Sequence, residues 1–327
     1  MEHGQYVVAF ESGLEDFVTE NKYTKEDLKQ LQSLSLSVKI GITQTRIREW
    51  YTRFNGACFV SYSGGLDSTV LLDLTRRCYP DIEAVYASTL DLPEIKRHIR
   101  GTRNVRWLQP KMTFAETVEK YGWCYPSKDI SLTVYYARRG SQWAINRLNG
   151  VRENGEPSVY RQRRYAKWKF LADSDYKISD KCCHVMKTQP LNEYERKSGK
   201  HSIIGTRADE SIRRKEAWLK IGCNSFDSKH PISKPLSFWT HQNILEYIKQ
   251  FNIPYAACYG DIVEDAKTHK LRTTGEQRTV CLCAIGCQLD KENRFMRLKS
   301  THPKLYDYII NSLKLGEFLD FAGVKYD

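Results

Sequence analysis

The sequence predicts an α/β protein built on a doubly wound, mostly parallel sheet. Three observations indicate this fold: short apolar strands alternate with helices, a glycine-rich turn follows the first strand, and 41% of the 327 residues are hydrophobic, enough for a sizeable core. Alternating strands and helices of this length form parallel sheets with helices on both faces. We therefore expect ligands to bind at the carboxyl ends of the strands.

Each expected element rests on a local pattern. Thr24 and the acidic residues after it begin a helical segment over 24–54. The apolar strand that starts at Cys58 runs into the glycine-rich turn, and a helix follows over 67–77. The remaining expected elements are strands at 82–87, 104–108 and 202–206 and helices at 113–121 and 244–251.

These elements predict three parts of the chain. Residues 1–54 form a helical segment that precedes the sheet. Residues 55–260 form the α/β domain, interrupted at about 124–180 by a less regular, basic insertion. Residues 261–327 form a helical region that carries a group of cysteines.

Composition restricts the class of protein. Lys and Arg number 51 against 39 Asp and Glu, and the net charge of +12 favours polyanionic partners, either nucleic acid or a phosphorylated nucleotide. No run approaches the roughly 20 apolar residues of a membrane helix, and the amino terminus does not resemble a signal peptide. We therefore expect a soluble, cytoplasmic protein. In that reducing compartment, ten cysteines indicate metal or redox chemistry rather than disulfides.

The glycine-rich turn, Ser63-Gly64-Gly65-Leu66-Asp67-Ser68, has the composition of a phosphate-binding loop. Its two glycines carry no Cβ, so backbone amides can approach an anion, and the next helix adds the positive end of its dipole. Asp67 either serves a magnesium ion or caps that helix. The alternative is a turn that binds nothing. The expected phosphate-binding residues are Ser61, Ser63, Gly64, Gly65, Ser68 and Thr69.

Five cysteines fall into two groups that are far apart in sequence. Cys182 and Cys183 are adjacent, and Cys281, Cys283 and Cys287 lie close together. Neighbouring residues cannot easily reach two corners of one zinc tetrahedron, whereas a larger iron-sulfur cube accepts such ligands. We therefore expect one shared iron-sulfur centre, with zinc as the alternative. The isolated cysteines are expected to be small buried hydrophobes: Cys58, Cys78, Cys124, Cys223 and Cys258.

A basic segment in the middle of the chain interleaves cations with aromatic residues. It includes Arg138, Arg139 and the run 161–169. Such a mixture can hold backbone phosphates and stack bases, or it can be a solvated helix face with a buried aromatic edge. The sequence supports both interpretations equally.

The Ser-Gly-Gly-x-Asp-Ser pattern at 63–68 resembles the PP-loop of the ATP pyrophosphatase superfamily, whose members hold a nucleotide's phosphates and typically activate a substrate by adenylylation. Together with the Cys182-Cys183 pair, it makes the chain similar to the iron-sulfur branch of the phosphoadenosine phosphosulfate (PAPS) reductase family from about residue 24 onwards. This resemblance implies a bound adenine nucleotide, either ATP or an adenylyl sulfate, with Mg²⁺.

The same resemblance implies a four-iron four-sulfur (4Fe-4S) cluster beside the nucleotide. In that branch, a Cys-Cys pair and a later Cys-x-x-Cys pair hold the cluster. Cys182 and Cys183 match the first pair. No two of Cys281, Cys283 and Cys287 have the Cys-x-x-Cys spacing, so the third and fourth ligands stay undecided among these three.

The segment 204–214 resembles the family's Gly-x-Arg-x-x-Glu-Ser element. By that resemblance, Arg207 approaches the phosphate or sulfate of the nucleotide, and Glu210 orients an arginine. A guanidinium group suits this task because its planar fork donates two parallel hydrogen bonds to an oxyanion. The implied nucleotide-binding residues are Gly205, Arg207 and Glu210, and the implied catalytic residues are Asp67, Arg207, Arg213 and Arg214. The segments 234–240 and 253–255 resemble the family's Pro-Leu-x-x-Trp and Ile-Pro-Tyr elements, to which we assign no chemistry.

Three functions are compatible with the resemblance. The first is an ATP pyrophosphatase-type sulfurtransferase, similar to the DNA phosphorothioation enzymes, which would adenylylate a nucleic-acid acceptor such as DNA or tRNA and receive sulfur from a donor protein such as a cysteine desulfurase. The second is a PAPS or adenylyl-sulfate reductase that produces sulfite. No cysteine follows Cys287, so the Glu-Cys-Gly-x-His tail of bacterial reductases does not occur here and Cys258 or Cys287 would have to replace its thiol. The third is a nucleotide-binding module that senses redox state.

Overall fold

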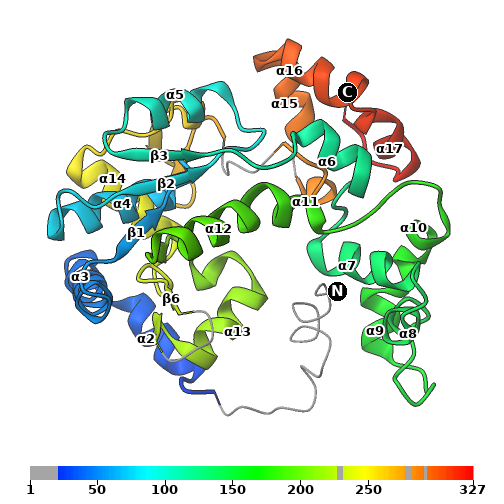
Figure 1. The fold of residues 1–327 in the computed structure, drawn as a ribbon, viewed down its shortest axis with the longest axis horizontal. Helices are drawn as coiled ribbons and strands as arrows, with labels where there is room; N and C mark the ends of the chain where they lie inside the picture. The colour runs from blue at the N-terminus through cyan, green and yellow to red at the C-terminus, as the bar shows by residue number, and fades with distance from the viewer. Residues whose placement is uncertain (1–20, 227–230, 277–281, 291–292, 327) are drawn as a thin grey trace. The chain divides into compact units, whose positions relative to one another are not determined.

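The computed structural model describes residues 21–226, 231–276, 282–290 and 293–326 (Figure 1). The chain divides into two units, each with its own buried core. The first contains the described parts of Met1–Tyr86, Glu94–Arg106 and Ser198–Gln277, and the second contains those of Ala87–Pro93, Trp107–Lys197 and Arg278–Asp327.

Two helices precede the sheet. α2 (Lys25–Ser33) begins at Thr24, whose hydroxyl accepts a hydrogen bond from the Asp27 amide at 3.1 Å, while the Asp27 carboxylate accepts one from the Thr24 amide at 2.7 Å. α3 (Leu36–Arg53) begins at Ser35, a second cap. The sequence predicted one helical segment here, and this second cap divides it into two helices.

A six-stranded sheet lies largely in the first unit. Its strands are β1 (Cys58–Ser61), β2 (Ala84–Ala87), β3 (Val105–Leu108), β4 (His201–Ile204), β5 (Asn224–Ser225) and β6 (Ile232–Ser233). Their order is β3-β2-β1-β4-β6-β5. β1 pairs in parallel with β2 and β4, β4 pairs in parallel with β6, and β5 is antiparallel to β6. The predicted doubly wound, mostly parallel fold class is confirmed.

Helices α4 (Leu66–Cys78), α5 (Pro93–Gly101), α13 (Ile212–Ile221) and α14 (His241–Phe251) accompany this sheet (Figure 1). α4 contacts α3 and α14, and its apolar side chains are buried together with those of β1. A separate hairpin consists of β7 (Ile262–Glu264) and β8 (Leu271–Thr273). Sequence reasoning missed β5 to β8 because strands of two or three residues leave too little alternation to recognise.

The second unit is helical among its described residues. The segment that was expected to be irregular contains α7 (Lys128–Ala137), α8 (Gln142–Leu148), α9 (Val159–Arg164) and α10 (Lys169–Asp173). The other helices are α6 (Phe114–Tyr121), α11 (Lys181–Cys183), α12 (Gln189–Ser198), α15 (Arg294–Thr301), α16 (Pro303–Asp307) and α17 (Leu315–Phe321). Tyr125 meets Phe318 edge-on in the core, with ring centroids 5.4 Å apart. No helix in the described part of the chain has the length and apolar character needed to cross a membrane.

Candidate functional site

The strand order reverses between β1 and β4, and this position is a topological switch point. From β1 the chain continues outwards through β2 and β3, whereas β4 lies on the opposite side of β1. Ser61 is in register with Ile204, so the carboxyl ends of the two strands lie side by side. Open parallel sheets bind ligands in the crevice at such a point. The predicted loop follows β1 and the predicted arginine segment follows β4, so both reach this edge.

The loop after β1 needs glycine at position 64. Gly64 has φ +72°, and a Cβ there would lie 2.9 Å from Cγ1 of Ile99. The loop is fastened internally, because the Ser63 amide donates to Oγ of Ser68 at 3.2 Å and that hydroxyl donates to the Gly65 carbonyl at 2.9 Å. The loop is therefore a preformed turn.

The loop leads directly into the amino terminus of α4. Its N-cap residue, Gly65, has no side chain to occupy the first-turn amides. The Leu66 amide donates to the Tyr259 hydroxyl at 3.4 Å, and the Asp67 side chain lies in the first turn. A helix that begins in this way can accept an anion at its positive end.

Gly205 allows the end of β4 to approach this helix closely. A Cβ at Gly205 would lie 3.1 Å from the Asp67 carbonyl oxygen and 3.3 Å from Cα of Ser68. The structure thus brings together the loop and the segment after β4, which are far apart in sequence. Ser61, Ser63, Gly64, Gly65, Ser68, Thr69 and Gly205 all lie at or next to this edge.

Arg207 is the central cation of this edge, and carboxylates already surround it. Only 6% of its side chain is exposed. Its Nε donates to Asp67, and its Nη1 donates to both oxygens of Asp209 at 2.7 Å. The backbone amide of Arg207 donates to Glu210 at 3.2 Å, and Glu210 also pairs with Arg214. Arg207 therefore has a fixed orientation, and its charge is largely compensated.

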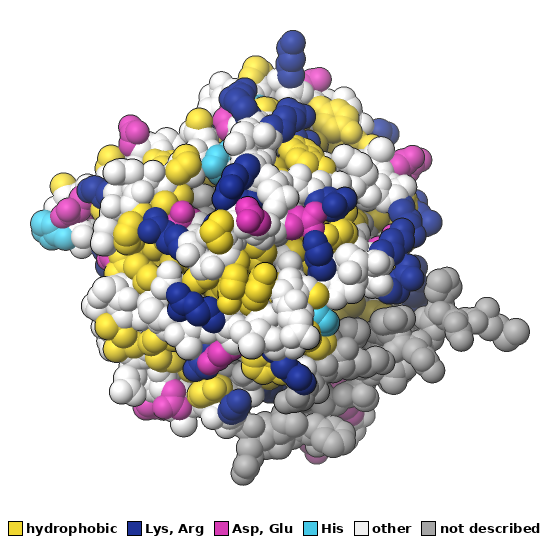
Figure 2. All heavy atoms as spheres, turned by 60° about the vertical axis from the view of Figure 1, so that its left-hand side comes forward, with side chains coloured by type: hydrophobic (Ala, Val, Ile, Leu, Met, Phe, Trp, Pro, Cys, Tyr) yellow, Lys and Arg dark blue, Asp and Glu magenta, His cyan; other side chains and the backbone are white. Residues whose placement is uncertain are grey.

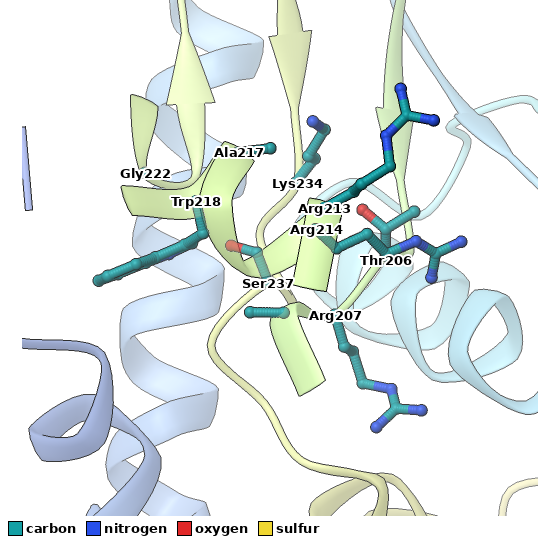
Figure 3. Close-up of a pocket in the computed structure, with 10 residues that line it drawn as sticks. Thr206, Arg207, Arg213, Arg214, Ala217, Trp218, Gly222, Lys234 and Ser237 are labelled. Atoms are coloured by element: carbon teal, nitrogen blue, oxygen red, sulfur yellow. The ribbon is translucent and has the colours of Figure 1, made fainter. Parts of the chain in front are cut away.

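A pocket of about 100 Å³ lies beside this arrangement (Figure 3). Its cations come from three segments: Arg207 follows β4, Arg213 and Arg214 lie on α13, and Lys234 lies just after β6. Figure 3 shows the Arg207 side chain extending away from those of Arg213 and Lys234. Burial and the positive charge of Arg214 lower the pKa of Lys234. Four cationic residues therefore line one small cavity, and two of them, Arg207 and Arg214, are already paired with carboxylates.

Four described cysteines from the two sequence groups lie in the second unit. Cys182 is buried and Cys183 is half-buried on α11, whereas Cys283 and Cys287 are buried in the turn after residue 281. Burial raises the pKa of Cys182 and Cys287 to about 12. The charges of Cys283 and Cys183 add to the shift at Cys182, and those of Asp290 and Cys283 add to it at Cys287. Cys283 contributes to both shifts, so the structure brings the two groups together. Cys281 lies outside the described residues.

Cys124 lies near this group of thiols; its burial agrees with the prediction for the isolated cysteines, whereas its position near the other thiols was not predicted. It is buried, its sulfur accepts a hydrogen bond from the Ser131 hydroxyl at 3.6 Å, and burial with the charges of Cys283 and Cys183 raises its pKa. The Gly286 amide donates to the Pro126 carbonyl at 2.9 Å and fastens the two segments together. Because Cys124 stands alone in the sequence, only this tertiary contact identifies it.

These thiols have the donor chemistry that an iron-sulfur cluster requires. Among the residues that the structure describes, no set of three or more His, Cys, Asp or Glu side chains is arranged to hold one metal ion. The thiols nevertheless lie near enough to raise one another's pKa. Thiolates that surround a cube of irons stand farther apart than those around one zinc ion, and ligation relieves their mutual repulsion.

The basic segment is partly structural. Arg138 donates to the carbonyls of Leu171, Ala172, Ser174 and Tyr176. Arg161 is 6% exposed and bonds Val151 and Glu153, and Arg164 pairs with Asp129 at 2.9 Å. Figure 2 shows another face, the one on the left of Figure 1, where Lys and Arg side chains are interspersed with acidic and apolar ones. These arginines stabilise the second unit. Their contacts favour the interpretation of the basic segment as a helix face over its interpretation as a nucleic-acid-binding surface.

The fold and the loop at its switch point define the class: a doubly wound α/β protein with a glycine-rich loop where such folds bind ligands. The model of the phosphoadenosine phosphosulfate reductase domain matches residues 57–287, well over half of the chain. The chain therefore belongs to the PAPS reductase family, which is a family of enzymes that includes sulfonucleotide reductases.

Two relatives illustrate the similarity. The chain is 23% identical over 223 residues to adenosine 5′-phosphosulfate reductase from Staphylococcus haemolyticus (strain JCSC1435), covering 65% of this chain and 70% of the relative. A solved structure of PAPS reductase from Candida auris, a phosphate complex, matches 72% of this chain and 90% of its own with 16% identity and a TM-score of 0.38.

Proposed function

We propose that the protein is a nucleotide-dependent sulfur-transfer or sulfonucleotide-reducing enzyme that binds an adenine nucleotide at the switch point. The observation that carries the proposal is that the glycine-rich loop and the segment after β4 meet at the switch point, where Arg207 contacts Asp67 and also lines the pocket of Arg213, Arg214 and Lys234. Loop amides and hydroxyls would hold one phosphate, and the pocket would hold a second phosphate or a sulfate.

The names of the relatives support sulfonucleotide reduction as one chemistry. In that reaction, a thiolate attacks the sulfate sulfur, the S–O bond to the nucleotide breaks, and the adenosine phosphate leaves with the bond's electron pair. A dithiol protein of the thioredoxin type then releases sulfite and becomes a disulfide. Loop amides and the pocket cations would stabilise the charge on the leaving phosphate.

The environment of Cys258 favours a second chemistry. Burial and the carboxylates of Glu94 and Glu276 raise the pKa of Cys258 to about 12, so it is a weak nucleophile near neutral pH. ATP-dependent activation needs no such thiolate. An oxygen of a nucleic-acid acceptor, DNA or tRNA, would attack the α-phosphorus of ATP and release pyrophosphate. The outer sulfur of a persulfide on a donor such as a cysteine desulfurase would then displace AMP, and a dithiol reductant would cleave the S–S bond, leaving one sulfur on the acceptor and becoming a disulfide. Asp67 would bind Mg²⁺ with the phosphates, in exchange for part of its contact with Arg207.

The thiol group would hold a 4Fe-4S cluster in either chemistry, through Cys182, Cys183 and two of Cys281, Cys283 and Cys287. When bound, such a cluster supplies electrons or a binding site for sulfur. The protein's own residues would bind the nucleotide, fix the position of its phosphates and keep the cysteine thiols in place around the cluster.

The products separate these chemistries. Anaerobically purified protein is incubated with ATP, with adenylyl sulfate or with PAPS, each with and without thioredoxin, and pyrophosphate and sulfite are measured. Thioredoxin-dependent sulfite would establish reduction, and pyrophosphate stimulated by DNA or tRNA would establish activation. Tight nucleotide binding with neither product would leave the regulatory module. Absence of nucleotide binding would contradict all three functions.

A further inference from the structure

The guanidinium of Arg294 has an unused donor next to the thiol group. Arg294 opens α15, and only 14% of its side chain is exposed. Its Nη1 is buried and makes no hydrogen bond to any residue that the structure describes. A buried, charged donor without a partner is costly, because it loses its hydration without compensation. The observation calls for an acceptor at this position.

Asp290 fixes the rest of the guanidinium. Its carboxylate accepts hydrogen bonds from Nε of Arg294 at 2.6 Å and from Nη2 at 3.0 Å. The Asp290 amide donates to the Cys287 carbonyl at 3.2 Å, so the carboxylate is itself tied to the cysteine turn. Two of the three guanidinium nitrogens are therefore clamped, and the direction of Nη1 is set.

The thiols of Cys283 and Cys287 lie near this guanidinium. Against the effect of burial, the contact with Asp290 raises the pKa of Arg294, and the negative charges of the two thiols raise it further. The positive charge of Arg294 in turn opposes the burial that raises the pKa of Cys287. Gly286 leaves the space open: a Cβ there would meet no atom nearer than Nη2 of Arg294, at 3.9 Å. No side chain at position 286 separates the guanidinium from the turn that carries both thiols.

We propose that Arg294 is a positioning residue for this thiol group, whose Nη1 donates a hydrogen bond to a sulfur of Cys283 or Cys287 or to a sulfide of the cluster they hold. The inference rests on the proposed cluster. Hydrogen bonds and positive charge at the sulfurs favour the more negative, reduced form of an iron-sulfur centre. Arg294 therefore raises the reduction potential, while Asp290 holds it in place.

The test is a redox titration of the anaerobically reconstituted full chain, monitored by visible absorption and electron paramagnetic resonance, with iron and sulfide content measured on each sample. We expect Arg294→Gln to retain iron and to be about tenfold harder to reduce, a shift of ~59 mV to more negative potential for one electron. Lys299→Gln is the matched control, because it removes one positive charge from an exposed position on the same helix, and its potential should equal that of the parent.

Two outcomes would overturn the inference in distinguishable ways. Absence of iron from the parent protein would overturn the cluster and this role with it. Iron in both proteins with the same potential in Arg294→Gln and the parent would overturn the role of Arg294 alone. If Arg294→Gln cannot hold iron, Arg294→Lys decides, since it keeps the charge and loses the clamped fork: a potential equal to that of the parent would then contradict the proposal.

Discussion

Arg207 donates a hydrogen bond through Nε to the Asp67 carboxylate, and this contact joins the segment after β4 to the first turn of α4. The two residues reach the switch point from different strands, Arg207 after β4 and Asp67 after β1. Arg207 is nearly buried, whereas 28% of the Asp67 side chain is exposed. The carboxylate can therefore meet an incoming ligand while the guanidinium stays fixed by Asp209.

Replacing Asp67 with Asn should destabilise the protein and disturb this edge. The substitution removes a charged acceptor from a buried guanidinium, which costs about 1.5–3 kcal/mol of unfolding free energy. Urea unfolding would measure it. Glu156→Gln is the control, because Glu156 pairs with Arg152 on an exposed surface and such pairs contribute less than about 1 kcal/mol. Equal effects of the two substitutions would contradict the importance of the Asp67–Arg207 contact.

Gly64 lies in the glycine-rich loop and Gly140 lies outside it, and the two glycines make a matched comparison. Gly64 and Gly140 have φ of +72° and +79°, so alanine at either position costs about 1–2 kcal/mol in backbone strain. An alanine Cβ at 64 would also press on Ile99, whereas nothing lies within 4 Å at 140. We expect Gly64→Ala to weaken nucleotide binding by calorimetry and to destabilise the fold more than Gly140→Ala does. Unchanged nucleotide affinity in Gly64→Ala would remove the loop from the binding site.

Local patterns sufficed to predict the parts of this edge that follow one another in the chain. The strand that starts at Cys58, the turn at 63–68 and the helix after it could be recognised because glycine, hydroxyl and apolar residues stand at fixed spacings. The arginine segment after β4 was found through its resemblance to a family element. Local signals failed where tertiary contacts decide. Cys124 and Arg294 belong to no recognisable motif, and Lys234 lies in a segment to which the sequence assigned no chemistry; only the fold places these residues at a thiol group or a pocket.

Cys283 is the thiol whose charge acts on the most neighbours, and its replacement should remove the metal. It influences the pKa of Cys124, Cys182 and Cys287, which places it centrally among the described thiols. We expect Cys283→Ser to lose most of the iron and sulfide found in the parent protein. Cys58→Ser is the control, since the Cys58 pKa is raised to about 12 by burial alone and this residue lies in the first unit. Full iron content in Cys283→Ser would exclude Cys283 as a ligand.

Lys234 should make nucleotide binding sensitive to alkaline pH. Burial and Arg214 lower the pKa of Lys234, so in the folded protein its ammonium loses its proton at a lower pH than an exposed lysine does. An oxyanion binds the charged form, and affinity should therefore fall as the pH rises through this lowered pKa. Lys234→Gln should weaken binding by about tenfold to a hundredfold near neutral pH, the loss of one charge-assisted hydrogen bond, and should abolish the alkaline decline.

Arg214→Gln provides the second arm of this test, because it removes the neighbouring charge that helps to lower the Lys234 pKa. The decline in affinity should then occur at higher pH, even though binding is weaker throughout. Lys215→Gln removes a charge from α13 outside the pocket and should leave the midpoint of the decline in place. Calorimetric titrations of ATP and of adenylyl sulfate between pH 7 and 10 would give these midpoints. A decline in Lys234→Gln identical to that of the parent would show that another group titrates, and the pocket would then not be the anion site.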